Sequence, residues 1–228
     1  MKLFGFKKEN RRLFLTIFGI KMNFVLPFGG NNKIILVKED GSEKRVPFIW
    51  GIRTNFHGKN STLRIHEPLA QYKNCRFIFA DDVIIDIESS NSVIFNLKII
   101  AEANGSKFIA DKNFKIVSGE FLFYKNAPNH TIKIGKDCLF SKDITIRISD
   151  GHIIKDYDTD EIINESKDIT IGDNVWVTEG VTIFKGSVIP NNTIIGYKSL
   201  VTRQFTEENT IIAGIPAKIV KRNTKWEE

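Results

Sequence analysis

Apolar residues recur at every sixth position through the C-terminal part of the chain. From residue 171 to residue 206 the sequence reads IGDNVW, VTEGVT, IFKGSV, IPNNTI, IGYKSL and VTRQFT. The opening residues of these units are Ile171, Val177, Ile183, Ile189, Ile195 and Val201. The fifth residue of the first five units is small or β-branched: Val175, Val181, Ser187, Thr193 and Ser199. A period of six matches neither an α-helix nor a simple hairpin, so the pattern predicts a short strand and a corner in each unit.

The same period is present upstream of residue 171. Regular units open at Ile134, Phe140 and Ile146, and fainter units open at Phe79 and Ile109. Polar insertions at residues 102–107 and 125–130 stretch the fainter units. A single coil of this kind cannot bury its inward face, whereas stacked coils share a continuous apolar interior. We therefore predict an all-β fold, a parallel β-helix solenoid.

Changes in the regularity of the repeat divide the chain. We predict one β-helix domain over residues 57–223, with irregular coils over 57–133 and regular hexapeptide coils over 134–206. A loop of residues 150–168 interrupts the regular coils, and residues 207–228 form a short C-terminal tail. We assign residues 1–56 to an N-terminal cap region.

The N-terminal region combines basic residues with apolar ones. The apolar positions are Leu3, Phe4, Phe6, Leu13, Phe14, Leu15, Ile17, Phe18 and Ile20. An apolar cap on the open end of the solenoid is the favoured interpretation, and peripheral contact with an anionic membrane is the alternative. The run at residues 13–20 is far shorter than the roughly 20 residues of a membrane span. No small-residue cleavage site follows it, so we expect neither a transmembrane helix nor a signal peptide.

The composition is that of a folded protein in a reducing compartment. The 228 residues are 42% hydrophobic and 26% charged, which argues against disorder. Cys75 and Cys138 are too few for a disulfide framework and lack the spacing of a zinc site, so we expect no metal and a cytoplasmic location. The basic residues behind the net charge of +6 gather near both ends of the chain. No basic stripe interleaved with aromatic residues is present, so we expect no binding to nucleic acid.

One of the four histidines lies where the hexapeptide period breaks. His152 follows the unit that opens at Ile146, and the period resumes only at Ile171. A loop must leave the solenoid between these units, and interruptions of a repeat often carry function. The other histidines, in polar loop contexts that favour a structural or solvent-facing role, are His57, His66 and His130. Of the four histidines, His152 is therefore the candidate for a functional role.

Two segments of the sequence resemble the hexapeptide-repeat acyltransferases. They read SDGHIIKDYDTDEIINESKDITIGDNVWV and AGIPAKIVKRN, and with the coils around them they cover residues 134–223, about 40% of the chain. A histidine in an SDGH element, an acidic loop, a VW pair and a PAK tail follow in the family's order. The subgroup they resemble is the bacterial O-acetyltransferases of capsule, lipopolysaccharide and sialic acid sugars. The resemblance implies a left-handed β-helix, acetyl-CoA as co-substrate, and a homotrimer with active sites between neighbouring subunits.

The resemblance also implies direct transfer of acetyl from acetyl-CoA to a sugar hydroxyl. His152 would take the hydroxyl proton as the oxygen attacks the thioester carbonyl. Trp176 either donates its indole N–H to the oxyanion or only packs within the coil. Asp150 is the candidate for orienting the imidazole, although the acidic loop offers other carboxylates, and Ser149 and Tyr157 are candidates for contact with the acceptor. Neither cysteine lies in a nucleophile setting, so we expect no covalent enzyme intermediate.

CoA carries a 3′-phosphate and a pyrophosphate, so its groove needs cations and backbone donors. The resemblance implies that the pantetheine arm lies near Gly180, Tyr197 and Lys198. It implies that the nucleotide end lies near Thr202, Arg203, Gly214, Pro216, Ala217, Lys218 and Lys221. Two residues depart from the family's pattern, because Thr178 replaces the usual Gly and Tyr197 the usual Ala.

The sequence thus predicts an acetyl-CoA dependent O-acetyltransferase acting on a sugar of a bacterial surface polysaccharide or its precursor. The alternatives are N-acetylation of an amino sugar or nucleotide sugar, a drug-modifying acetyltransferase, and a noncatalytic solenoid binding protein. A γ-type carbonic anhydrase uses the same helix but needs several zinc-binding histidines, and only His152 lies in the repeat. The expected location is the cytoplasm, at the inner face of the membrane if the N-terminal region binds lipid.

Overall fold

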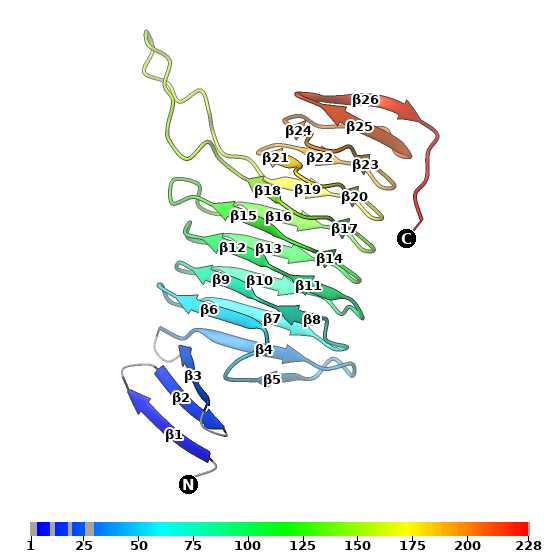
Figure 1. Cartoon of the computed structure of the whole chain (residues 1–228). Helices are drawn as coiled ribbons and strands as arrows, with labels where there is room; N and C mark the ends of the chain where they lie inside the picture. The colour runs from blue at the N-terminus through cyan, green and yellow to red at the C-terminus, as the bar shows by residue number, and fades with distance from the viewer. Residues whose placement is uncertain (1–3, 10–11, 18–19, 26–29, 228) are drawn as a thin grey trace.

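The computed structural model of the chain is built from β-strands and the turns between them. It describes residues 4–9, 12–17, 20–25 and 30–227. These residues contain no helix, and therefore none long and apolar enough to cross a bilayer. Figure 1 shows a stack of coils that begins near β4 and ends at the paired strands β25 and β26.

Three long sheets form the sides of the stack. Sheet I contains β4 (Lys33–Val37), β5 (Glu43–Arg45), β7 (Thr62–His66), β10 (Ile84–Ile87), β13 (Lys107–Ala110), β16 (Thr131–Ile134), β19 (Ile169–Ile171) and β22 (Val188–Ile189). Sheet II contains β8 (Gln71–Lys73), β11 (Val93–Phe95), β14 (Lys115–Ile116), β17 (Leu139–Phe140), β20 (Trp176–Val177), β23 (Ile194–Ile195), β25 (Thr210–Gly214) and β26 (Ala217–Arg222). Sheet III contains β6 (Ile52–Phe56), β9 (Cys75–Phe79), β12 (Leu97–Ala101), β15 (Gly119–Phe123), β18 (Ile144–Arg147), β21 (Thr182–Phe184) and β24 (Leu200–Val201).

From β7 to β24 the chain passes through the sheets in the order I, II, III. In the regular coils, three hexapeptide units return the chain to the strand beside its starting point. Aligned neighbours are therefore Ile134, Ile171 and Ile189 in sheet I; Phe140, Val177 and Ile195 in sheet II; and Ile146, Ile183 and Val201 in sheet III. Each of these side chains is at most 1% exposed. The second predicted register is equally buried, at Val175, Val181, Ser187, Thr193 and Ser199. Both registers predicted from the sequence are confirmed as the interior of the solenoid.

One of the fainter upstream units was predicted in the wrong phase. Ile109 lies on the outer face of β13, whereas its neighbours Phe108 and Ala110 point inward and are buried. Ala110, not Ile109, lies beside Ile134. Because successive side chains of a strand point to opposite faces, a phase error of one residue reverses inside and outside.

Aromatic rings fill the interior of the middle coils. Phe108, Phe114, Phe121 and Phe140 form a contacting group, with ring centroids 5.3 to 6.3 Å apart. All four are at most 1% exposed. The middle coils are longer than the later ones and enclose larger side chains, which explains why their hexapeptide pattern is faint.

The stacked sheets start before residue 57, the predicted beginning of the solenoid. Strands β4 and β6 already pair in parallel with β7 and β9. Ahead of them β1 (Phe4–Glu9), β2 (Arg12–Ile17) and β3 (Ile20–Val25) form a separate antiparallel sheet. Of the apolar positions predicted to form a cap or touch a membrane, Leu3 and Phe18 lie outside the described residues.

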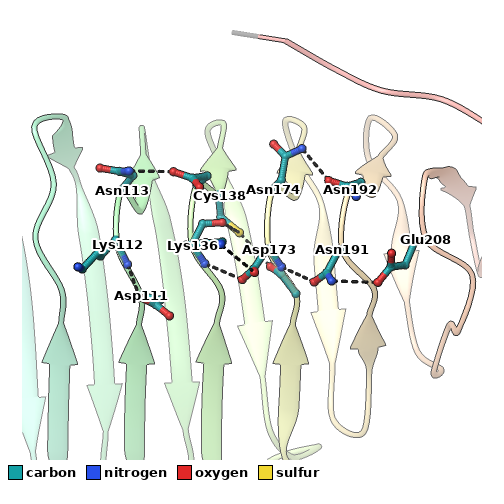
Figure 2. A network of polar contacts seen from close by, with 12 residues as sticks. Asp111, Lys112, Asn113, Lys136, Cys138, Asp173, Asn174, Asn191, Asn192 and Glu208 are labelled. Carbon is teal, nitrogen blue, oxygen red and sulfur yellow. Dashed lines mark hydrogen bonds and ion pairs between the residues drawn. The ribbon is translucent and has the colours of Figure 1, made fainter.

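Asn and Asp residues make the corners between sheets I and II, which we call the I–II corner. Asn113, Asp137, Asn174 and Asn192 adopt positive φ angles at this corner of four successive coils. Asn and Asp tolerate this backbone conformation better than other residues with a side chain. Their side chains bond from coil to coil: Asn113 Nδ2 donates to Asp137 Oδ1 at 2.8 Å, and Asn174 Nδ2 to Asn192 Oδ1 at 2.9 Å (Figure 2).

A second polar row stabilises the same corner. Asp173 Oδ1 accepts the Lys136 N–H at 3.0 Å, and Asn191 Oδ1 accepts the Asp173 N–H at 2.8 Å. Asn191 Nδ2 in turn donates to Glu208 Oε1 at 2.9 Å (Figure 2). Each side chain thus satisfies a polar group of the neighbouring coil, which fixes the spacing and register of the stack.

The last coil is closed by a hairpin instead of another repeat. Strand β25 runs parallel to β23, and β26 turns back antiparallel to β25. The chain then returns along the I–II corner, where Thr224 N donates to Asn209 O at 2.9 Å and Trp226 Nε1 donates to Asn174 O at 2.9 Å. This reversal ends the parallel stack.

Replacing Phe121 by Ala should lower the free energy of unfolding by about 3–5 kcal/mol, because it leaves a cavity among four packed rings. Urea unfolding at fixed protein concentration measures the change. Tyr157→Ala is the control, since Tyr157 is 100% exposed and its loss should change stability by about 0.5 kcal/mol or less. Equal effects of the two substitutions would contradict the assignment of Phe121 to the core.

Candidate active site

The long interruption of the repeat leaves the stack at the corner between sheets III and I, the III–I corner. The chain departs after β18 and rejoins the stack at β19, and Figure 1 shows the connecting loop extending well beyond the coils. A bridge between Lys155 and Ile162 makes its outer part a narrow antiparallel arm. Near the tip, the N–H groups of Thr159 and Asp158 bond to Asp156 Oδ1 and lower the pKa of that carboxyl. We call residues 150–168 the active-site loop.

The SDGH element forms the turn at the base of this loop. Ser149 is 1% exposed, and its Oγ accepts the N–H of Gly151 at 3.2 Å. Gly151 has a φ of 87°, a conformation that glycine adopts without strain. His152 follows and is exposed. The element therefore presents the histidine to solvent, while the Ser149 hydroxyl is buried and bonds within the turn.

Asp150, predicted to orient the imidazole, bonds to other groups. Its Oδ2 accepts from Lys185 Nζ at 2.5 Å and from Asn164 Nδ2 at 2.9 Å. The hydrogen bond from Lys185, then that from Asn164, holds the pKa of Asp150 below its usual range, with a further contribution from the charge of Arg147. Sequence reasoning missed Lys185 and Asn164, because they lie 35 and 14 residues from Asp150 along the chain.

Arg147 is the last residue of β18, just before the SDGH element. Its guanidinium carbon lies 5.0 Å from the ring centroid of Tyr124 and 5.4 Å from that of Phe184, so the cation is held between two aromatic faces. Arg147 Nη2 donates to the Asp150 carbonyl at 3.5 Å. Together with Lys185 it makes the base of the loop positively charged.

Trp176 lies on sheet II and not at the III–I corner. It is half-buried, its Nε1 donates to Ser141 Oγ at 3.5 Å, and its ring lies 6.0 Å from that of Trp226. Within one chain it is therefore on a different side of the solenoid from His152. The candidate acceptor contact Tyr157 is at the far end of the active-site loop and fully exposed.

Several residues predicted to bind CoA meet at the corner between sheets II and III, the II–III corner. Lys198 Nζ lies 5.2 Å from the ring centroid of Tyr197. A Cβ on Gly180 would lie 2.9 Å from Lys198 Cγ, so these coils approach closely here. The β25–β26 hairpin reaches the same corner, because Gly214 N donates to Ser199 Oγ at 3.0 Å. Pro216 is exposed at the hairpin tip and Ala217 is buried beside it.

The remaining predicted CoA contacts are more dispersed. Thr202 and Arg203 are exposed just after β24, on the way to the III–I corner. Lys218 and Lys221 are exposed on β26, opposite Ala213 and Ile211. The hydroxyl of Thr178, which departs from the family's pattern, donates to the Ile195 carbonyl at 2.7 Å and so is satisfied within the coils.

The other titratable candidates have structural contacts. His66 Nε2 lies 2.8 Å from Asp86 Oδ1, and His130 Nδ1 lies 2.9 Å from Asp168 Oδ1, where the active-site loop rejoins the stack. Both cysteines are buried, and burial raises the pKa of the Cys138 thiol to about 12, so it presents no nucleophile. Among the described residues, no three His, Cys, Asp or Glu side chains are placed to hold a metal ion.

Comparison with known proteins adds an independent line of evidence, although no family model matches the chain. The chain is 30% identical to the putative lipopolysaccharide biosynthesis O-acetyl transferase WbbJ of Escherichia coli K12, over 69% of this chain and 86% of that protein. It is 35% identical to a polysialic acid O-acetyltransferase of Escherichia coli O1:K1 over 56% of this chain, and spans 40% of that longer protein.

A solved structure is similar over most of the chain. The polysialic acid O-acetyltransferase OatWY superimposes with a TM-score of 0.61 and 26% identity, covering 87% of this chain and 90% of that one. The likeness extends over the long middle coils as well as the regular ones. The chain therefore belongs to the hexapeptide-repeat O-acetyltransferases, and its fold is their left-handed parallel β-helix.

Proposed function

We propose that the protein transfers an acetyl group from acetyl-CoA to a sugar hydroxyl of a bacterial surface polysaccharide or its precursor. The observation that carries the proposal is His152, an exposed imidazole on a fixed turn at the long break in a regular solenoid. The membership of the family supports the acetyl donor and the ester product. The names of the relatives, which concern lipopolysaccharide and polysialic acid, support a surface glycan as the acceptor.

In this reaction the acceptor oxygen attacks the thioester carbonyl while His152 removes its proton. A C–O bond forms as the carbonyl becomes a tetrahedral oxyanion, and the C–S bond then breaks. The imidazolium returns the proton to the departing thiolate, so free CoA and an acetyl ester are the products. No enzyme side chain is acetylated, in keeping with the buried state of Cys75 and Cys138.

A homotrimer would complete the site. The outer face of sheet II carries a row of apolar side chains that pair along the strands, unlike the polar outer face of a typical exposed sheet. Leu139, Trp176, Ile194 and Ile211 pair in succession along the strands. Lys115 separates them from Val93, which has Phe95 and Val117 beside it. Packing this face against the III–I corner of a neighbouring subunit would bury the apolar row and bring Trp176 to the neighbour's His152.

CoA would lie between subunits, along the II–III corner. Gly180 adopts a φ of 72° there, and Tyr197 and Lys198 are exposed beside it. Arg203 and Lys218 offer cations for the phosphates. The Trp176 indole N–H, which makes only a long hydrogen bond at 3.5 Å, is available to the oxyanion.

We place the reaction in the cytoplasm, where acetyl-CoA is made, and at the inner face of the membrane when the acceptor is lipid-linked. The basic, apolar N-terminal region supports such contact, since several basic residues near apolar ones favour an anionic surface.

His152→Ala should reduce the turnover of acetyl-CoA by about 100-fold or more, because no other group takes the hydroxyl proton. Thiol release measures turnover, and calorimetry should find CoA binding unchanged. His57→Ala is the matched control, an exposed histidine at the III–I corner of an early coil, and should retain wild-type activity. Near-normal turnover of His152→Ala would contradict the assignment of the base.

Oligosaccharides with free hydroxyls should be acetylated in preference to free amino sugars. Sialic acid polymers, hexose oligosaccharides and amino nucleotide sugars, each incubated with acetyl-CoA, can be compared by mass spectrometry before and after mild alkali. Esters are removed by alkali, whereas amides remain. An alkali-resistant product formed only on the amino sugars would overturn O-acetylation in favour of N-acetylation.

A further inference from the structure

Asn164 joins the two ends of the active-site loop by hydrogen bonds on both sides of His152. Its Nδ2 donates to the carbonyl oxygen of His152 at 2.8 Å, and its Oδ1 accepts the N–H of Ile154 at 2.7 Å. The two peptide groups that follow His152 are therefore both hydrogen-bonded to one side chain, which lies on the part of the loop that returns to the stack. The same Nδ2 also donates to Asp150 Oδ2 at 2.9 Å.

Lys185 holds this arrangement against the solenoid. It follows β21, so it belongs to the stacked coils and not to the loop. Its Nζ donates to Asp150 Oδ2 at 2.5 Å and to the Asn164 carbonyl at 2.8 Å. Its side chain is only 19% exposed, so solvent screens the ion pair with Asp150 less than it screens a pair on the open surface.

Apolar packing within the chain does not hold the loop in place. Its large apolar side chains Ile153, Ile154, Ile162 and Ile163 are all between 47% and 63% exposed. Hydrogen bonds to Asn164, Asp150 and Lys185 are thus the main described contacts that fix the start of the loop. The orientation of an imidazole on a loop depends on how firmly the main chain of that histidine is held.

We propose that Asn164, held by the Lys185–Asp150 ion pair, is a positioning residue that fixes the main chain of His152 and so orients its imidazole toward the acceptor. The proposal rests on the proposed function of His152 as the base. It gives Asp150 an indirect role, through the backbone of the histidine, in place of direct contact with the ring. Misplacement of a catalytic group by about 1 Å costs on the order of 100-fold in rate, so such a contact can control turnover without touching substrate.

Asn164→Ala should lower kcat by about 10- to 100-fold and leave the KM for acetyl-CoA within about twofold, since none of the hydrogen bonds of Asn164 is to a candidate CoA residue. Lys185→Met should have a similar effect, and Lys185→Arg, which keeps the charge, should recover most of the loss. Lys155→Met is the matched control, because it removes the Lys155–Asp160 pair at 2.7 Å near the loop tip and should keep wild-type kcat. An unchanged kcat in Asn164→Ala would overturn the proposal.

Chemical rescue separates positioning from a general loss of structure. In His152→Gly, free imidazole at high concentration can enter the space of the missing ring and act as the base. Because free imidazole does not depend on the backbone of residue 152, adding Asn164→Ala to His152→Gly should leave the rescued rate within about twofold. A rescued rate that falls as far as kcat falls in Asn164→Ala alone would mean that Asn164 maintains the whole site, and would overturn the positioning role.

The same series of variants tests the role of His152 as the base separately from the role of Asn164 as a positioning residue. If His152→Gly without imidazole turns over like the wild type, the proposed function of His152 fails. If His152→Gly is inactive while Asn164→Ala is normal, only the positioning role fails. Melting temperatures of all variants, measured at one protein concentration, identify any variant that is unfolded. If Asn164→Ala is unfolded, a lower kcat in Lys185→Met than in Lys185→Arg supports the positioning role, and equal values overturn it.

Discussion

The left-handed backbone conformation at the corners is the constraint on which the rest of the structure depends. A coil of short strands must turn sharply between sheets, and a positive φ makes the turn tight. Asn, Asp or Gly supplies it at successive coils, as at Asn113, Asp137, Asn174 and Asn192 of the I–II corner. The side chains of the Asn and Asp residues then bond to the neighbouring coil, so the residue that makes the turn also sets the register of the stack.

A stack fixed in this way tolerates an insertion at a corner, because each coil contacts only its neighbours. Strand β19 pairs with β16 in register even though the active-site loop separates them. The solenoid can therefore be rigid while the loop carries the proposed catalytic base, His152. The coils hold the base of the loop through the side chain of Lys185, which extends from the turn after β21 and donates hydrogen bonds to Asp150 and Asn164.

Local patterns in the sequence predicted the inward registers, the break at His152 and the family, because each of these features depends on residues close together in the sequence. Where large side chains and longer coils blur the period, the prediction failed by one residue, as at Ile109. The partners of Asp150 were beyond prediction, because Lys185 and Asn164 approach it only when distant segments meet at one corner. The sequence also could not reveal that Trp176 and His152 lie on different sides of one chain.

That separation makes the shared active site of the proposed homotrimer, with His152 from one subunit and Trp176 from the next, the central claim. Chains with His152→Ala and chains with Trp176→Ala, each with its own affinity tag, can be coexpressed and the doubly tagged trimers isolated. If each variant alone is inactive, a mixed trimer should recover about one third of wild-type activity, because one of its three interfaces holds both intact side chains. Mixed trimers no more active than the parent variants would contradict the shared site.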